Sequence, residues 1–272
     1  MSPFKTKICT LYGNKGKVWL EDLPHHIEKI AKDWGLSNLN PVSNLSYNYV
    51  LSGFRGTQPI ILKLGFDEEG LQREARALRA FEGFGAVKVL EERPGELLLE
   101  RAVPGLSLKD YNKKKAIQIS CQVMKQLHQA PIPPGSSFPS IDEWLKALDR
   151  TTDIPQHFLK KARHLRDRLS KDSSERVLLH GDLHHENILL NGKDWVVIDP
   201  KGVIGTPIHE TWAFVMDFER DTQFVADFFS FPPQDVRSWY FVHLMLAACW
   251  NVEDKISPTL FLNLAEKTYP LV

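Results

Sequence analysis

Apolar and polar residues alternate along the first hundred positions in a pattern that predicts paired β-strands. The segments YNYVLSG (47–53) and PIILKLG (59–65) flank a turn near residues 55–58, so they predict a β-hairpin. VKVLEER (87–93) and ELLLER (96–101) flank a Pro-Gly turn and predict a second hairpin. Antiparallel strands therefore dominate the first part of the chain.

Apolar positions at helical spacing predict a series of helices. The first opens at Pro24 and runs to about Trp34, with Gly35 as its stop, and a second covers residues 68–82. Further helical patterns follow in the second part of the chain, at residues 113–130, 141–149, 155–170, about 209–229, 233–251 and 257–267.

The pattern changes at the connector VPGLSL (103–108), after which helices dominate and one small hairpin at 188–199 interrupts them. A strand-rich part followed by a helix-rich part predicts an α+β protein with two lobes, residues 1–102 and residues 103–272. The cleft between two lobes is a favoured place for a ligand, and we expect the functional site there.

The stretch LLHGDLHHENILL (178–190) carries polar side chains between two apolar runs, and the hairpin behind it folds the chain back onto them. Asn191-Gly192 is a strong two-residue turn signal. With these two residues as the loop, His184 lies level with Asp199, whereas a four-residue loop (191–194) puts Glu186 there. Either register gathers three oxygen-bearing side chains at one end of the hairpin: Asp182, Asn187 and Asp199.

Two carboxylates and one amide oxygen are hard ligands of the kind that Mg²⁺ uses when it shares its coordination with phosphates. We expect Asn187 and Asp199 to hold Mg²⁺, and Asp182 to orient an acceptor hydroxyl and take its proton. Two other interpretations are ordinary turn polars and a zinc site. Zinc fits less well, because His184 and His185 are adjacent and point in opposite directions in an extended segment.

The motif H-G-D-L-x-x-x-N followed by I-D resembles the protein-kinase catalytic loop H-R-D-x-x-x-x-N and the metal-binding aspartate of D-F-G. On these residues the chain resembles the aminoglycoside phosphotransferase family. The longer match, HGDLHHENIL and then WVVIDPKGVIG, is similar to its streptomycin and hydroxyurea phosphotransferase branch. Other similar segments occur in order: WGL (34–36), LSYNYV (45–50), ILKL (61–64), GAVKVL (85–90) and LLLER (97–101).

The resemblance implies a bilobal protein-kinase-like fold with an antiparallel-sheet N-terminal lobe that binds ATP and a mainly helical C-terminal lobe with the catalytic loop and the acceptor site. It implies transfer of the γ-phosphoryl group to a hydroxyl of a small molecule. This acceptor would be either an aminoglycoside such as streptomycin, or hydroxyurea, and the activity would give antibiotic resistance. Kinases of the same fold also act on choline, methylthioribose, homoserine or fructosamines, and these remain alternatives, as does a non-catalytic nucleotide-binding protein.

A lysine and a glutamate fit the phosphate-binding pair of such kinases. Lys63 lies in the apolar strand 59–65. On the helix 68–82, Glu74 falls at the edge of the inward apolar face, where a carboxylate needs a partner. We expect Lys63 and Glu74 to pair, so that the lysine meets the α- and β-phosphates of ATP; an edge-strand lysine in water is the alternative.

Other nucleotide contacts follow from the resemblance. The chain lacks a G-x-G-x-x-G loop, and SNLSYNYV (43–50) takes its place, with Asn44 and Ser46 as candidate phosphate contacts. Adenine is expected to meet the backbone of the hinge near Glu100 and Ala102.

The acceptor site is less clearly marked. No A-P-E motif follows Asp199, which disfavours a protein substrate. Glu210 and Asp217 follow the metal-binding aspartate and would give a cationic antibiotic an acidic wall; solvated helix charges are the alternative. The G-D-L-H-H run also raises a metal-dependent phosphoesterase, but no second His and Asp cluster for a second metal follows downstream.

Composition narrows the setting of this chemistry. The 34 basic and 34 acidic residues cancel, so a nucleic-acid or anionic-membrane surface is not expected. Three widely spaced cysteines disfavour a disulfide framework, and the start MSPFKTKIC lacks an apolar signal core. We expect a cytoplasmic enzyme whose partners are ATP and a small hydroxylated acceptor.

Overall fold

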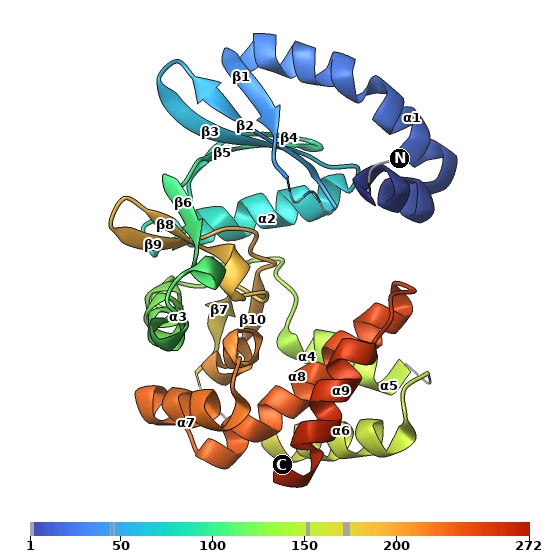
Figure 1. Ribbon diagram of the computed structural model, residues 1–272, viewed down its shortest axis with the longest axis vertical. Helices are drawn as coiled ribbons and strands as arrows, with labels where there is room; N and C mark the ends of the chain where they lie inside the picture. Colours follow the sequence, from blue (N-terminus) through green and yellow to red (C-terminus); the bar gives the residue numbers. More distant parts are fainter. Residues whose placement is uncertain (1–2, 44, 46, 151–152, 171–174) are drawn as a thin grey trace.

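A five-stranded antiparallel sheet packs between two helices in the first part of the fold, and most other helices lie on the far side of α2 (Figure 1). The computed structural model describes residues 3–43, 45, 47–150, 153–170 and 175–272. The sheet has the strand order β1-β2-β3-β5-β4. Its strands are β1 (Leu36–Pro41), β2 (Tyr49–Arg55), β3 (Gln58–Leu64), β4 (Val89–Arg93) and β5 (Glu96–Glu100).

The structure confirms both predicted hairpins, β2-β3 and β4-β5. Strand β1 was not predicted, because its sequence LSNLNP buries a single residue, Leu36, and its pairing with β2 is irregular between Ser37 and Asn40. The β2-β3 register sets Val50 opposite Lys63, so both side chains lie on the same face of the sheet. That face is turned toward the second half of the molecule.

Two helices cover the sheet. Helix α1 (Pro3–Trp34) bends at Gly13, whose φ of 58° and ψ of −134° are not helical, and it ends at Gly35 as predicted. The prediction that Pro24 opens the helix is wrong, because the chain is already helical before it. Buried Leu23 and Ile30 hold this stretch against the sheet, and such packing contributes more to a helix than local propensity does. Helix α2 (Glu68–Ala80) begins at Asp67, which caps it.

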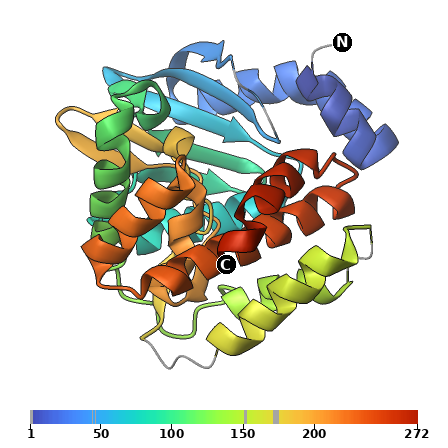
Figure 2. The same ribbon diagram turned by 60° about the horizontal axis from the view of Figure 1, so that its bottom comes forward.

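The second half is mainly helical, and Figure 2 shows α6, α8 and α9 side by side. Among the described residues, every helix is too short or too polar to span a membrane. The α-helices are α3 (Lys113–Leu127), α4 (Ile141–Leu145), α5 (Ala147–Arg150), α6 (Gln156–Leu169), α7 (Phe218–Phe229), α8 (Pro233–Glu253) and α9 (Thr259–Thr268). Short 3₁₀ helices are η1 (Leu108–Asp110), η2 (His185–Asn187), η3 (Pro207–Phe214) and η4 (Tyr269–Leu271).

Two small sheets join these helices to the first half. Strands β6 (Pro104–Ser107), β8 (Ile188–Asn191) and β9 (Asp194–Val197) form one, and β7 (Val177–Leu179) pairs with β10 (Val203–Gly205) in the other. The β8-β9 hairpin pairs Asn191 with Asp194, so its turn consists of Gly192 and Lys193. Of the two expected registers, this one sets Glu186 level with Asp199 and brings Asp199 back to η2.

The buried centre of the helical half contains two histidines in contact. His209 Nδ1 and His243 Nε2 are 3.0 Å apart, the Trp239 ring packs on His209, and Trp212 stacks on His243. Burial lowers the pKa of His209 to about 3 and lowers the pKa of His243 well below its ordinary value. Both imidazoles are therefore neutral in the folded protein.

This pair predicts a loss of stability in mild acid. An unfolded histidine has a pKa of about 6.5, so below that pH the unfolded chain binds protons that the folded chain does not. The free energy of unfolding, measured by urea denaturation, should fall by about 1.2 kcal/mol per histidine between pH 7 and pH 5.5. In the variant His243→Gln this fall should be smaller by about 1.2 kcal/mol, the share of one histidine; an unchanged pH dependence in the variant would contradict the assignment.

Candidate active site

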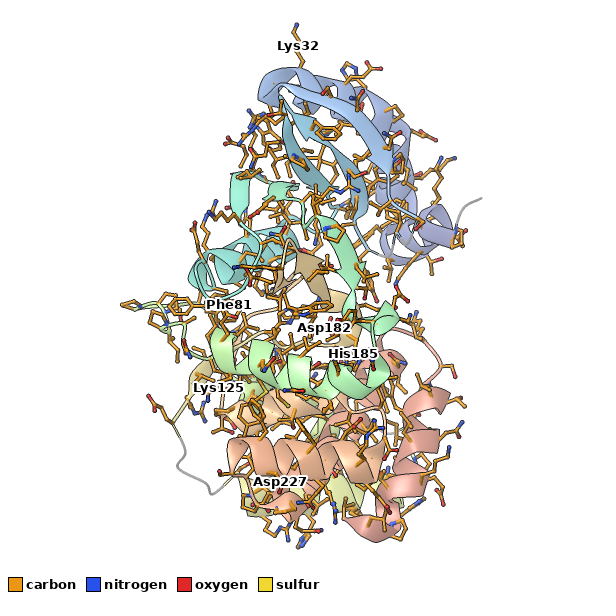
Figure 3. The ribbon with its side chains drawn as sticks, turned by 60° about the vertical axis from the view of Figure 1, so that its left-hand side comes forward. Lys32, Phe81, Lys125, Asp182, His185 and Asp227 are labelled. Carbon is orange, nitrogen blue, oxygen red and sulfur yellow. The ribbon has the colours of Figure 1, made fainter. Side chains whose placement is uncertain are left out.

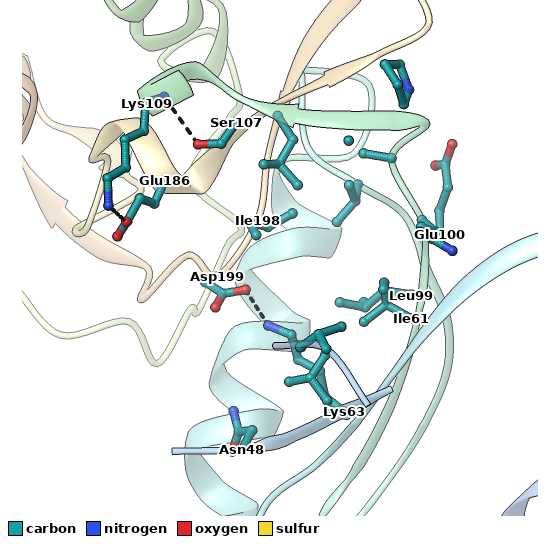
Figure 4. Close-up of a pocket in the computed structure, with 18 of the residues that line it drawn as sticks. Asn48, Ile61, Lys63, Leu99, Glu100, Ser107, Lys109, Glu186, Ile198 and Asp199 are labelled. Atoms are coloured by element: carbon teal, nitrogen blue, oxygen red, sulfur yellow. Dashed lines mark hydrogen bonds and ion pairs between the residues drawn. The ribbon is translucent and has the colours of Figure 1, made fainter. Parts of the chain in front are cut away.

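A cavity of about 450 Å³ opens between the five-stranded sheet and the β6-β8-β9 sheet (Figure 4). Apolar side chains line it from both sides: Val50, Ile61, Val87 and Leu99 from the first half, and Leu189 and Ile198 from the second. A flat slot with apolar faces suits the two faces of a heteroaromatic base. Its polar groups lie in separate places: Lys63 lies with Asp199, Glu100 lies at the hinge, and Lys109 lies with Glu186 (Figure 4).

The Lys63 ammonium lies between the carboxylates of Glu74 and Asp199, and Figure 4 shows its contact with Asp199. Lys63 Nζ donates to Glu74 Oε1 at 2.6 Å and also to Asp199 Oδ1. These side chains come from β3, α2 and the segment after β9, so one ammonium joins the two halves of the molecule. Asp199 has a φ of 61°, a left-handed conformation that is uncommon for a residue other than glycine.

Electrostatics keeps Lys63 charged. Burial alone lowers the pKa of Lys63, but the charges on Asp199 and Glu74 outweigh it and raise this pKa above its ordinary value. Burial raises the pKa of Glu74, with Lys63 opposing the shift. For Asp199, burial acts upward, but the Lys63 ammonium holds the pKa below its usual range. The predicted pairing of Lys63 with Glu74 is present in the geometry.

Asp182 and Asn187 lie on the loop 180–187, and Figure 3 shows Asp182 between the sheet and the lower helices. Asn187 is buried, and its Nδ2 donates to the backbone oxygen of Asp182 at 2.9 Å, so its Oδ1 is the atom left to bind a ligand. The Asn187 backbone oxygen accepts from the amide of Ile198 at 3.0 Å, next to Asp199. The Asp182 side chain is 37% exposed, which leaves its carboxylate open to an acceptor.

His180 connects this loop to the segment after β9 that carries Asp199. Its Nε2 donates to the backbone oxygen of Ile198 at 2.9 Å, and its Nδ1 accepts from the amide of Asp182 at 3.2 Å. Burial lowers the pKa of His180, which fits the neutral imidazole that this bonding needs. One histidine thus sets the spacing between the candidate base and the candidate metal ligand.

Glu210 does not form an acidic wall for the acceptor, and that prediction is wrong. The residue is 3% exposed and lies beneath the loop 180–187, where its carboxylate accepts from the amides of His180 at 2.5 Å and Gly181 at 3.0 Å. Burial raises its pKa, but the nearby His128 imidazole and these backbone donors hold the pKa of Glu210 below its ordinary value. A carboxylate held this way positions the loop instead of meeting the acceptor.

The other predicted contacts have different outcomes. Asp217 is exposed and caps α7 by accepting from the amide of Arg220 at 3.1 Å, so the geometry gives it a helix-capping role. Asn44 and Ser46 lie outside the described residues. Glu100 and Ala102 line the cavity, as expected for the hinge. Among the described residues, the Ala102 amide has no acceptor, which leaves it available to a base.

Sequence reasoning missed several cavity residues. Asn48 lines the cavity just before β2 begins, together with Val50 of that strand. Lys109 and Glu186 form an ion pair at the cavity mouth (Figure 4). No local pattern relates these two, because they are 77 positions apart in the chain.

The donor set suits Mg²⁺ better than zinc. Asn187 Oδ1 and the Asp199 carboxylate are hard oxygen ligands. The hydrogen bond from the Ile198 amide to the Asn187 backbone oxygen brings the two residues near each other. In the described part of the chain, no three His, Cys, Asp or Glu side chains gather as a metal cluster, which gives neither the zinc site nor a two-metal phosphoesterase any support. His184 approaches Asp182, with 3.8 Å between Nε2 and Oδ1, whereas His185 is buried.

Comparisons with known proteins agree with this geometry. A family model described as aminoglycoside/hydroxyurea antibiotic resistance kinase matches residues 41–254. Streptomycin 6-kinase of Streptomyces griseus is 28% identical over 213 residues, which cover 74% of this chain and 69% of that protein.

Solved structures show the same fold. A thermostable mutant of the aminoglycoside phosphotransferase APH(4)-Ia, in a ternary complex with AMP-PNP and hygromycin B, has a TM-score of 0.69 at 16% identity and covers 89% of this chain and 95% of its own. Choline kinase LicA from Streptococcus pneumoniae has a TM-score of 0.69 at 15% identity, covering 90% and 97%. The expected α+β, protein-kinase-like fold is confirmed.

The position of Glu210 predicts a measurable effect of removing its charge. In Glu210→Gln, one side-chain oxygen must serve two backbone amides, and the new amide group faces donors. A buried donor without its acceptor costs about 1–3 kcal/mol, so the free energy of unfolding in urea should fall by that amount, and turnover should fall with it. The control Glu219→Gln makes the same change at an exposed position. Equal stability of the two variants would contradict the role of Glu210.

Proposed function

Because this chain belongs to the aminoglycoside/hydroxyurea antibiotic resistance kinase family, it is a small-molecule phosphotransferase that uses ATP, and we propose that its acceptor is streptomycin, a related aminoglycoside or hydroxyurea. The acceptor proposal rests on the family and on the streptomycin kinase that the chain resembles. A metabolite kinase of choline type is the second candidate, since choline kinase LicA has the same fold.

The single observation that carries a catalytic role is the Lys63 ammonium bound by both Glu74 and Asp199, with Lys63 and Asp199 lining the cavity. Lys63 and Glu74 are buried, whereas the Asp199 side chain is 40% exposed. Burying charged groups is costly unless they serve one another, and a structural role does not require Lys63 and Asp199 to face a cavity. A non-catalytic nucleotide-binding protein would have no need to keep a half-exposed carboxylate, Asp182, beside this network.

Each of these residues has a proposed task. The apolar slot and the hinge at Glu100 and Ala102 bind the base, and Lys63 contacts the α- and β-phosphates. Asp182 accepts a hydrogen bond from the acceptor hydroxyl and takes its proton as the oxygen attacks the γ-phosphorus. His180, the Asn187 side chain and Glu210 hold Asp182 in place. Catalysis then consists mostly of positioning and charge stabilisation.

Asn187 and Asp199 are the proposed Mg²⁺ ligands. When bound, the ion neutralises charge on the β- and γ-phosphates. Asn187 is prepared for this task, because its Nδ2 is engaged at 2.9 Å with Asp182 and only Oδ1 remains. Asp199 would exchange part of its contact with Lys63 for the ion.

The two parts of the chain have different proposed tasks. We propose that residues 1–102 bind the nucleotide and that residues 103–272 supply the catalytic loop and the acceptor site. We propose that the enzyme acts in the cytoplasm, because ATP is available there.

Replacement of the proposed base tests the mechanism. Asp182→Asn should fold and bind ATP as the wild type does, and kcat should fall by about 10²–10⁴-fold, the usual worth of a general base. Asp194→Asn, an exposed position in the β8-β9 hairpin, is the matched control and should keep its activity. Turnover of Asp182→Asn at the wild-type rate would remove Asp182 from this role.

A screen of acceptors tests the substrate. ADP release should be stimulated by streptomycin or hydroxyurea, and phosphorus NMR should detect a new phosphoester on the acceptor. Stimulation by choline or another metabolite alcohol alone would replace the proposed acceptor but leave the kinase assignment standing. ADP release that no acceptor stimulates, together with failure to bind ATP, would overturn the kinase mechanism.

A further inference from the structure

Lys201 is held at the active site by its backbone. Its amide donates to the backbone oxygen of His180 at 2.8 Å, and the amide of Gly202 donates to the same oxygen at 3.2 Å. The same carbonyl therefore anchors Lys201 to the start of the loop 180–187, two residues before Asp182. Lys201 also follows Asp199, the candidate metal ligand, by two positions in the chain.

The ammonium of Lys201 lies beside Asp182 without being bound to it. Lys201 Nζ is 3.9 Å from Asp182 Oδ2, beyond hydrogen-bond distance, and the Lys201 side chain is 54% exposed. On the other side of the carboxylate, His184 Nε2 is 3.8 Å from Oδ1. An exposed pair at this distance contributes little to stability, so the lysine is free to meet an incoming anion.

Lys63 is less able than Lys201 to contact an incoming anion. Its side chain is 6% exposed, and two carboxylates already surround its ammonium. Lys63, Glu74, Asp199 and Asp182 together carry two more negative charges than positive ones, and ATP adds several more. The charge of Lys201 also acts on this network. Burial raises the pKa of Asp199, the Lys63 ammonium lowers it, and the charge of Lys201 lowers it further.

We infer that Lys201 is a catalytic residue whose ammonium contacts the γ-phosphoryl group during transfer. The acceptor oxygen forms a bond to the γ-phosphorus while the bond from that phosphorus to the β–γ bridging oxygen breaks. The bridging oxygen leaves with the electron pair as part of ADP, and the acceptor proton passes to Asp182. Lys201 stabilises the charge on the equatorial oxygens of the moving phosphoryl group and exchanges no proton.

This inference rests on the proposed phosphotransferase mechanism, and its test uses streptomycin as acceptor and water as a second acceptor. Lys201→Met keeps the length of the side chain and removes its charge. We expect kcat to fall by about 10²–10³-fold, as for other preorganised charge-stabilising groups, with KM for ATP changed less than about threefold. Lys201→Arg should recover most of the loss. Lys193→Met removes a lysine from the exposed β8-β9 turn and should behave as the wild type.

A binding measurement separates contact with the phosphoryl group from positioning of Asp182. Calorimetry should show that Lys201→Met binds ADP normally but binds ADP with aluminium fluoride, a mimic of the transferring group, at least about tenfold more weakly. The weakening should persist in the Asp182→Asn background, because Lys201 touches the phosphoryl group directly.

The outcomes distinguish the two proposals. A wild-type protein that does not bind ATP and releases ADP with none of the screened acceptors overturns the proposed function, and the inference with it; if another acceptor than streptomycin is active, the Lys201 test uses that acceptor. Wild-type turnover with an unchanged kcat in Lys201→Met overturns the inference alone. Equal weakening of ADP with and without aluminium fluoride, or no weakening in the Asp182→Asn background, also overturns it, because Lys201 would then act through the nucleotide site or through Asp182.

Discussion

The active site depends on one ammonium shared by two carboxylates. Lys63 comes from the sheet, Glu74 from the helix behind it and Asp199 from the second half, so the ion network exists only when both halves are correctly packed. The isolated charges would be costly to bury, and removing one partner of a buried pair typically costs about 3–5 kcal/mol. The network that we propose to bind phosphate therefore also holds the two halves in register.

A second layer holds the loop that faces this network. Glu210 accepts from two consecutive backbone amides, and His180 joins the loop to the segment after β9. Both residues are buried, and both side chains form hydrogen bonds with backbone groups. Because Glu210 and His180 bind the backbone of the loop, the side chains of Asp182 and Lys201 remain free on the open side. Rigid backbone with available side chains is the arrangement that positional catalysis needs.

The sequence predicted those parts of the site that local geometry determines. The hairpin turn after Asn191 brought Asp199 back to Asn187, and the helical period placed Glu74 opposite Lys63. Glu210 could not be predicted in the same way, because only the packing of η3 beneath the loop decides whether its carboxylate meets solvent or backbone amides. Pro24 failed as a helix start for a related reason, since contacts with the sheet outweighed the local signal.

The charges around Asp182 have a consequence for the acceptor. Lys201 and His184 flank the carboxylate, and the acidic residues expected nearby, Glu210 and Asp217, serve the fold instead. At 4 Å, two like charges near a protein surface repel by about 4 kcal/mol. An aminoglycoside must therefore present a hydroxyl to Asp182 with its ammonium groups directed away from Lys201. The repulsion that excludes one orientation favours the other, so the cation that we propose to assist the phosphoryl group would also help to select which hydroxyl receives it.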